Sequence, residues 1–336
     1  MRPILDKLQE KKNLTRGQMQ SVMTEIMSGR ATELEMHEFL TTLNAKGATV
    51  EEITGAAQIM RRFVLPVDVD HDVVLDTCGT GGDEKHTFNI STLAAIVVAA
   101  CGVMVAKHGN RSVSSHCGSA DVLEALGVKI SLPHERVQEC LKTVGLAFLF
   151  AQSHHPAMKH IAAIRKSLGV KTIFNILGPL TNPARATHQM MGVYSKHLVE
   201  QMAHVHQNLG AKRAIVVHGA DGLDEMTTTD YTYVSEFNGQ EVISYTVTPQ
   251  KFGIRPAKDE FLRGGDIQEN AAIARAILSG ETGPKRDIVL LNAAFALYAA
   301  ERVKTPLEGF AMATEAIDAK RAALKLEELQ EFTNRV

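Results

Sequence analysis

The chain has 336 residues with 36 Lys and Arg against 38 Asp and Glu, so its formal charge of −2 at pH 7 argues against nucleic-acid binding through bulk positive charge. Aromatic residues make up only 5% of the chain and Trp is absent, so a surface built to stack nucleobases is poorly supplied. Hydrophobic residues, at 45%, suffice for a sizeable core, and the length suggests about two domains.

The N-terminus and the cysteines indicate a reduced, cytoplasmic protein. The opening residues Met1–Asp6 are charged too early for a secretion signal. The four cysteines form no C-x-x-C pair, so zinc-ligand spacing is absent and a disulfide scaffold is implausible at this size. The longest apolar run, 93–106, has 14 residues interrupted only by Gly102, which is too short to span a bilayer and predicts a buried helix that leads into a strand.

The first 68 residues predict helices only. Three capping boxes follow one another, in which a Thr caps the helix start and the acid or amide three residues later caps back: Thr15/Gln18, Thr32/Glu35 and Thr49/Glu52. Each box opens a stretch with apolar residues at helical spacing, and no catalytic cluster occurs here. We therefore expect a helical packing or subunit-association domain over 1–68, joined by helices from about 156–186.

After Asp68 strands and helices alternate, which predicts a mostly parallel sheet with right-handed crossovers. The expected strands are 73–76, 103–106, 128–130, 147–150, 188–193 and 214–218. The later expected helices are 197–209, 268–279, 287–301 and a charged helix over 313–332, and 231–262 is expected to be a β-rich excursion. The predicted fold class is α/β, with an all-helical N-terminal domain packed on a larger α/β domain over 69–336.

The first candidate loop runs from Asp76 to Asp83 and continues into an apolar helix. Its glycines let backbone N–H groups approach an anion closely, and Asn89 or Ser91 places an oxygen beside the positive helix end. This suggests phosphate or pyrophosphate, although the spacing is neither that of a dinucleotide fingerprint nor that of a P-loop. A tight turn followed by a helix cap is the alternative.

The second candidate loop, 107–115, ends in Gly118-Ser119 and crowds two cations, a His and several hydroxyls together. Lys107 offers a point charge and Arg111 a bidentate fork for phosphate oxygens, with backbone amides around Gly109. An ordinary solvated loop is the alternative.

The third loop, 152–158, carries two adjacent histidines without a spaced partner, so we expect His155 to form a wall or hinge of a substrate site rather than to ligate a metal. The sequence alone leaves the role of His154 open and makes Arg165 a solvated or ion-paired residue.

The fourth loop places Asp224 and Glu225 just after a strand. Their oxygens suit Mg²⁺, which shares one or two carboxylates with substrate phosphates, although an acidic turn is the plainer interpretation. Since ligands of open parallel sheets sit outside the carboxyl ends of the strands, the four loops together predict a magnesium-assisted site for a polyphosphorylated sugar or nucleotide.

Seven motifs follow one another along the chain: D-T-C-G-T-G-G-D (76–83), F-N-I-S-T (88–92), K-H-G-N-R-S-V-S-S (107–115), G-S-A-D-V-L-E-A-L-G (118–127), H-P-A-M-K (155–159), N-I-L-G-P-L-T-N-P (175–183) and D-G-L-D-E (221–225). In this order they resemble the anthranilate phosphoribosyltransferase family of tryptophan biosynthesis, which is nucleoside phosphorylase-like. The resemblance implies a homodimer through the helical domain and a site between the domains.

The resemblance also implies residue roles. It implies that 5-phosphoribosyl 1-pyrophosphate (PRPP) binds Gly79, Gly82, Asp83, Thr87, Asn89, Ile90, Ser91, Thr92, Lys107, His108, Gly109, Asn110, Arg111, Ser112, Val113, Ser114, Ser115 and Ser119. It implies Mg²⁺ at Ser91, Asp224 and Glu225, and anthranilate at Gly79, Asn110 and Arg165. Two departures flank this site. Gln152 stands where the family often has Pro, and His116-Cys117 stands where the family often has Lys or Arg before a small residue.

The implied reaction transfers the phosphoribosyl group to the amine of anthranilate and gives N-(5-phosphoribosyl)anthranilate and pyrophosphate, the second step from chorismate to tryptophan. An arylamine is already neutral near pH 7, so we nominate no general base. A pyrimidine nucleoside phosphorylase of similar fold and a nucleic-acid-binding protein on the same fold are the alternatives. We expect small-molecule substrates and neither nucleic acid nor membrane as partners.

Overall fold

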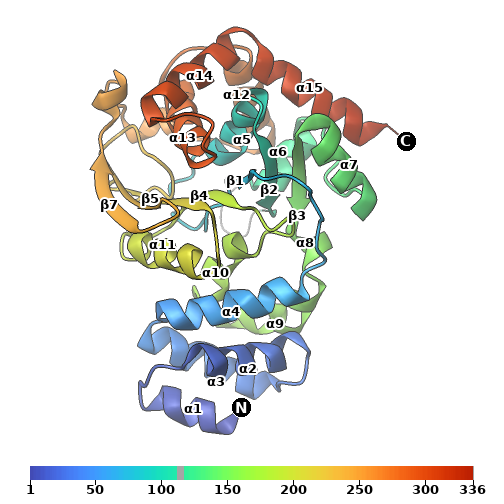
Figure 1. The fold of residues 1–336 in the computed structure, drawn as a ribbon, viewed down its shortest axis with the longest axis vertical. Coiled ribbons are helices and arrows are strands. Elements are labelled where there is room, and N and C mark those ends of the chain that lie inside the picture. The colour runs from blue at the N-terminus through green and yellow to red at the C-terminus, as the bar shows by residue number, and fades with distance from the viewer. Residues whose placement is uncertain (112–116, 336) are drawn as a thin grey trace.

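The computed structural model describes residues 1–111 and 117–335. An N-terminal helical part lies below a larger α/β part (Figure 1). The N-terminal helices are α1 (Arg2–Gln9), α2 (Arg16–Met27), α3 (Glu33–Lys46) and α4 (Val50–Phe63). Among the described residues, every helix falls short of the length and apolar character that crossing a lipid bilayer requires.

The rest of the described chain alternates strands and helices. The strands are β1 (Val74–Asp76), β2 (Met104–Gly109), β3 (Leu146–Phe150), β4 (His188–Gly192), β5 (Arg213–Gly219), β6 (Thr232–Phe237) and β7 (Val242–Val247). The helices are α5 (Ile90–Ala100), α6 (Ser119–Ala125), α7 (His134–Val144), α8 (Ala151–His154), η1 (Pro156–Met158), α9 (Lys159–Leu168), α10 (Phe174–Leu177), η2 (Gly178–Thr181), α11 (Leu198–Asn208), η3 (Pro249–Phe252), η4 (Asp259–Leu262), α12 (Ile267–Leu278), α13 (Pro284–Ala299), α14 (Pro306–Asp318) and α15 (Arg321–Asn334).

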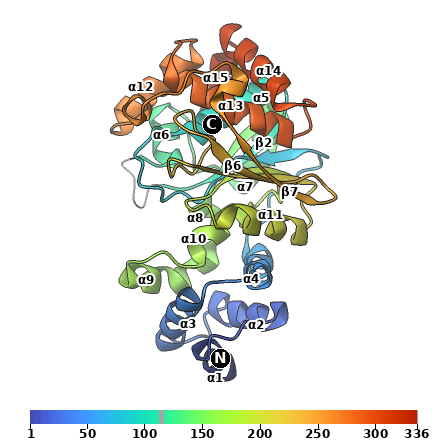
Figure 2. The ribbon, with the colours of Figure 1, turned by 90° about the vertical axis from the view of Figure 1, so that its left-hand side faces the viewer.

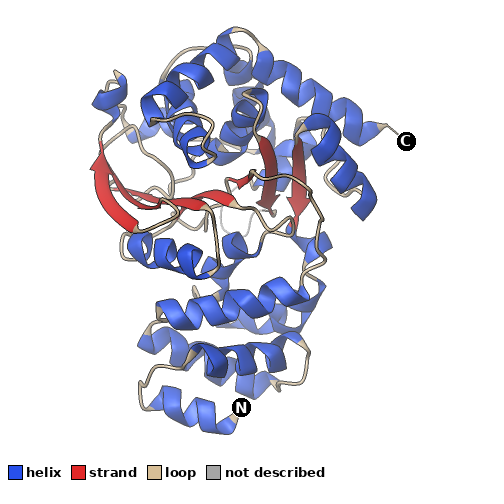
Figure 3. Cartoon of the chain, in the orientation of Figure 1, coloured by secondary structure: helices blue, strands red, loops and turns tan. Residues whose placement is uncertain are grey.

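The strands form one sheet in the order β3-β2-β1-β4-β5-β6-β7, which crosses the middle of the α/β part (Figure 3). From β3 to β5 all neighbouring strands are parallel, and β6 and β7 add an antiparallel edge. The mostly parallel sheet is confirmed, and the expected β-rich excursion is the β6–β7 hairpin.

Strand β5 has apolar neighbours on both sides. Ile215 and Val217 belong to one buried cluster, which contains α5, α12 and α13, whereas Val216 belongs to the other. The second cluster contains α11 and also apolar residues of α1–α4, α9 and α10, which lie side by side in Figure 2. A continuous apolar core therefore joins the N-terminal helices to one face of the sheet.

Two expectations from the sequence were wrong. Residues 128–130 form no strand, because the Lys129 N–H donates to the Thr333 hydroxyl (3.2 Å) rather than to a neighbouring strand. The charged segment 313–332 is not one helix but parts of α14 and α15, since Lys320 takes a left-handed conformation (φ +62°) that interrupts the helical hydrogen bonds.

The three capping boxes are confirmed, with both reciprocal hydrogen bonds present in each. In the third box the Glu52 carboxylate is fully buried and accepts hydrogen bonds from Thr49 N (2.7 Å), Leu14 N (2.8 Å) and Lys46 Nζ (2.8 Å). The capping acid of α4 therefore also fixes the start of α2 and the end of α3.

Replacing Glu52 with Gln is expected to lower the free energy of unfolding of the helical part by about 3 kcal/mol, because Lys46 would remain buried without its anion. Urea unfolding followed by circular dichroism measures this loss. Glu51→Gln is the control, since Glu51 pairs with Arg16 at the surface and should change stability by less than about 1 kcal/mol. Equal losses in the two variants would contradict the prediction.

Candidate active site

The carboxyl end of β1 is organised by Asp76, whose carboxylate is fully buried. It accepts hydrogen bonds from Cys78 N and His108 N (3.1 Å each) and from Asn182 Nδ2 (2.8 Å). Burial raises the pKa of Asp76 to about 6, against the lowering effect of the Lys107 charge. Asp76 thereby ties the glycine loop, the basic loop and the 175–183 motif together, a role that sequence reasoning missed because it depends on burial.

Three carboxylates from two loops meet beside the start of α5. The Asp224 carboxylate accepts a hydrogen bond from Gly81 N (2.7 Å), and Asp224 N donates to Asp83 Oδ2 (3.3 Å). The backbone and hydroxyl of Ser91 donate to Glu225. We call Asp83, Ser91, Asp224 and Glu225 the carboxylate cluster.

The pKa values of Asp224 and Glu225 in the carboxylate cluster are raised, because buried groups of like charge lie close together. Burial, Asp83 and Glu225 raise the pKa of Asp224 well above its ordinary value. Burial also raises the pKa of Glu225, although Lys107 and the Ser91 hydrogen bonds oppose the rise. Carboxylate and hydroxyl oxygens are the donors that Mg²⁺ prefers, so this set of residues fits that ion.

Gly192, at the end of β4, permits this approach of the two loops. A Cβ at this position would lie 1.5 Å from the Asp224 carbonyl oxygen. The Gly192 carbonyl also accepts a hydrogen bond from Thr80 N (2.9 Å), while Thr80 Oγ1 accepts one from Tyr194 N (3.0 Å). Sequence analysis did not find this role of Gly192, because only the order of β1, β4 and β5 in the sheet brings these residues together.

Lys107 is the buried cation of the site. Its Nζ lies 3.3 Å from Thr77 Oγ1 and 3.4 Å from both Thr77 O and Ser91 Oγ. The structure therefore brings Lys107 to the carboxylate cluster, as the phosphate hypothesis requires.

The rest of the basic loop is only partly described. The Arg111 guanidinium pairs with Asp121 (2.8 Å) and Glu124 (2.5 Å) of α6, so it is not turned toward the carboxylate cluster. Gly109 is required for packing, because a Cβ there would lie 2.4 Å from Ser119 Oγ. The predicted residues Ser112, Val113, Ser114 and Ser115, and the departure at His116, lie outside the described residues.

At the start of α5, the expected role of the Asn89 side chain was wrong. Asn89 does not cap the helix with its side chain; its amide donates instead to the Cys117 carbonyl (3.0 Å). Ile90 and Thr92 are buried, so a ligand would meet the backbone of the first turn rather than these side chains.

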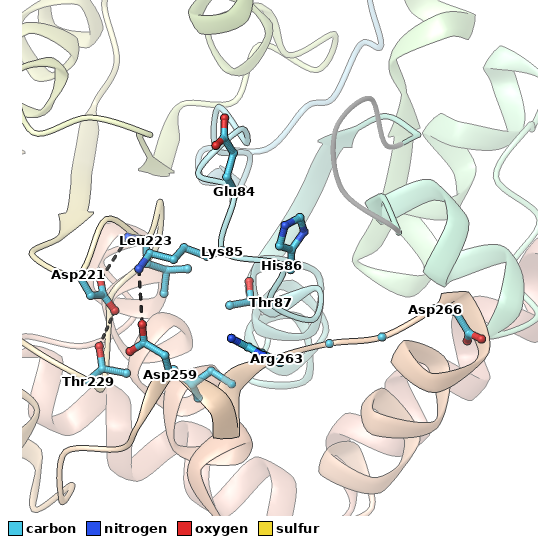
Figure 4. A pocket seen from close by; sticks show the side chains of 13 residues that line it. Glu84, Lys85, His86, Thr87, Asp221, Leu223, Thr229, Asp259, Arg263 and Asp266 are labelled. Atoms are coloured by element: carbon cyan, nitrogen blue, oxygen red, sulfur yellow. Dashed lines mark hydrogen bonds and ion pairs between the residues drawn. The ribbon is translucent and has the colours of Figure 1, made fainter.

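A pocket of about 640 Å³ lies beside the segment that precedes α5 (Figure 4). Of the predicted site residues that the structure describes, only Thr87 lines it. The charged walls of the pocket are mixed, with Lys85 ion-paired to Asp259 at 3.5 Å. Residues of the carboxylate cluster do not line this pocket, although Glu84 and Leu223, the chain neighbours of Asp83 and Asp224, do.

Two buried histidines join the second and third loops. His155 Nε2 lies 3.2 Å from His108 Nε2, and burial lowers the pKa of both imidazoles, that of His155 to about 4. Both rings are therefore neutral at pH 7, and one donates a hydrogen bond to the other. His154 Nδ1 lies 3.2 Å from the Leu65 carbonyl and so fixes the chain that follows α4.

Arg165 and Asn110, the two side chains predicted to bind anthranilate, have different partners in the structure. The Arg165 guanidinium carbon lies 5.6 Å from the Phe174 ring centroid, and burial lowers the pKa of Arg165. In residues 1–111 and 117–335 no carboxylate pairs with this cation, so the ion pair that the sequence alone suggested as one possibility is not observed, and the side chain is half-buried. Gln152 Nε2 donates to Asn110 Oδ1 (3.3 Å), which places this departure in direct contact with a predicted site residue.

Comparison with known proteins covers the whole chain. Residues 71–323 match the glycosyl transferase family, a/b domain, and residues 2–64 match its helical bundle domain. Anthranilate phosphoribosyltransferase of Acetivibrio thermocellus is 52% identical over 99% of this chain and 97% of the relative, and that of Symbiobacterium thermophilum is 51% identical over 100% and 98%.

Solved structures of proteins with the same name as these relatives are similar to this chain over nearly its whole length. Anthranilate phosphoribosyltransferase of Thermus thermophilus superimposes with a TM-score of 0.94 at 43% identity and covers 98% of this chain and 99% of its own. The Saccharomyces cerevisiae enzyme in complex with PRPP and Mg gives a TM-score of 0.87 at 29% identity over 96% and 94%, and its complex with 4-fluoroanthranilate gives 0.89 at 27% over 100% and 99%.

Proposed function

This chain belongs to the anthranilate phosphoribosyltransferase family, and we propose that it transfers the phosphoribosyl group of PRPP to the amine of anthranilate with the help of Mg²⁺. The products are N-(5-phosphoribosyl)anthranilate and pyrophosphate. The observation that carries this proposal is that Asp83 meets Asp224 while Glu225 bonds Ser91, and that the buried Lys107 also contacts Ser91. Such a site combines metal ligands with a cation and helix-terminal amides, as a diphosphate requires.

The residue roles are part of the proposal. Asp224, Glu225 and Ser91 hold Mg²⁺, and Arg165, Asn110 and Gly79 hold anthranilate. PRPP contacts the described residues Gly79, Gly82, Asp83, Thr87, Asn89, Ile90, Ser91, Thr92, Lys107, His108, Gly109, Asn110, Arg111 and Ser119. Arg111 would have to exchange its α6 partners for phosphate, whereas Lys107 already points to the cluster.

The reaction forms a bond from the amine nitrogen to ribose C1, breaks the bond from C1 to the pyrophosphate oxygen, and releases one N–H proton of the amine to the departing pyrophosphate or to water. Bond cleavage beside the ring oxygen favours an oxocarbenium-like transition state. Lys107 and the glycine-loop amides stabilise the negative charge that develops on the departing pyrophosphate. Mg²⁺, when bound, neutralises part of the same charge.

Anthranilate needs positioning more than activation. The Arg165 guanidinium suits a benzoate carboxylate through a bidentate pair, and this fixes the amine against C1. The attacking amine is neutral, so the neutral pair His108 and His155 has no proton to remove before the attack.

One assay tests the proposed function. Anthranilate fluorescence should fall when the protein is mixed with PRPP and Mg²⁺, and should persist without Mg²⁺. Phosphate-dependent cleavage of a pyrimidine nucleoside without Mg²⁺ would establish a phosphorylase instead, and salt-sensitive binding of RNA without either reaction would establish a nucleic-acid-binding protein.

Three further parts of the proposal are not tested by this assay. The helical domain is proposed to comprise 1–68 with helices from about 156–186, and the shared apolar core supports this grouping. The homodimer through that domain and the cytoplasmic location stay predictions.

A further inference from the structure

Lys171 reaches from the segment between α9 and α10 to the glycine loop. Its Nζ donates a hydrogen bond to the Gly82 carbonyl at 2.6 Å and lies 4.2 Å from the centroid of the Tyr194 ring. Gly82 has a left-handed backbone (φ +77°), and a Cβ there would lie 3.4 Å from Lys171 Cε. The ammonium is therefore seated against the loop that is assigned to PRPP.

The charge of Lys171 is not neutralised by any residue that the structure describes. Within residues 1–111 and 117–335, no carboxylate forms an ion pair with it, and its partners there are a carbonyl oxygen and an aromatic face. An ammonium has three N–H donors and no acceptor, so the bond to Gly82 leaves donors free. The Tyr194 ring attracts the cation without cancelling its charge.

Lys171 also belongs to a different part of the fold from the loop it contacts. Ile173 and Phe174, two and three residues after it, lie in the apolar cluster that contains the N-terminal helices. Gly82 follows β1 of the sheet. The hydrogen bond therefore connects the segment that packs with the helical part to the glycine loop of the α/β part.

We propose that Lys171 is a further binding residue for the pyrophosphate group of PRPP, contributed from the helical side of the site. Its ammonium bonds a pyrophosphate oxygen with a free donor, while Gly82 and Tyr194 hold it in place. Lysine binds phosphate as a point charge, so the effect depends on charge and not on a bidentate geometry. This inference rests on the proposed function.

Lys171→Met tests the inference, because Met keeps an unbranched stem and removes the charge. The KM for PRPP and the dissociation constant of inorganic pyrophosphate with Mg²⁺ should each rise about 10-fold, while the KM for anthranilate changes by less than about twofold. Lys171→Arg should restore most of the PRPP affinity. Lys166→Met is the matched control, since Lys166 is exposed on α9, and it should leave both affinities unchanged.

Two results would overturn the inference. One is an unchanged affinity for PRPP and pyrophosphate in Lys171→Met. Another is an equal rise in the KM of both substrates that Lys171→Arg does not restore, which is the behaviour of a purely structural contact. If Lys171→Met does not fold, Lys171→Gln takes its place with the same expected loss. A wild-type protein that does not consume anthranilate would instead refute the proposed function itself.

Discussion

The double substitution of Asp224 by Asn and Glu225 by Gln is expected to lower kcat/KM by at least about 100-fold at low Mg²⁺ and to raise the Mg²⁺ concentration needed for half-maximal activity. Both carboxylates lie in the carboxylate cluster, and amide oxygens carry no charge to hold the ion. The loss should therefore shrink as Mg²⁺ is raised. Initial rates of anthranilate consumption over a range of Mg²⁺ concentrations measure it.

The same variant should not be less stable without Mg²⁺. The pKa values of Asp224 and Glu225 are raised in the folded state, so ionisation of these two carboxyl groups near pH 7 lowers the free energy of unfolding. Asn and Gln do not ionise, so the double variant does not lose this free energy. Asp230→Asn is the control, because Asp230 is an exposed acid of the same β5–β6 connection. If the double variant kept the wild-type dependence on Mg²⁺, the assignment of Mg²⁺ to Asp224 and Glu225 would be wrong.

Arg165→Met is expected to raise the KM for anthranilate by about 30-fold and the KM for PRPP by less than about threefold. The reason is that the partly buried guanidinium has only the Phe174 ring as its counterpart among the described residues, and so is available for a carboxylate from the substrate. Met preserves the aliphatic packing on Phe174. Arg165→Lys should recover part of the affinity, since it restores the charge without the bidentate fork.

A comparison of substrates makes this prediction specific. Wild-type protein should prefer anthranilate to aniline, which lacks the carboxylate, and Arg165→Met should lose most of that preference. Lys166→Met, the neighbouring lysine on α9, should keep it. Equal effects of Arg165→Met on anthranilate and aniline would exclude a contact between Arg165 and the carboxylate.

The features that sequence analysis predicted well rest on interactions within a few residues. Thr49 and Glu52 bond each other three positions apart, and their pattern is legible without any tertiary information. The strands before the four loops were likewise predicted, because buried strands are apolar and end at glycines or polar residues. The failures at 128–130 and at Lys320 have the opposite origin, since contacts with α15 and a left-handed residue overrode the local pattern.

The amino-acid sequence by itself therefore determined the helical N-terminal part, the alternating α/β pattern and the types of side chain that the site contains. Only the tertiary structure decided that Asp224 meets Asp83 across 141 residues, that Gly192 makes room for this contact, and that Lys171 reaches Gly82. The physical reason is that these distances depend on the order of the strands in the sheet and on the packing of α9 and α10. Such long-range contacts have no periodic or short-range signature along the chain.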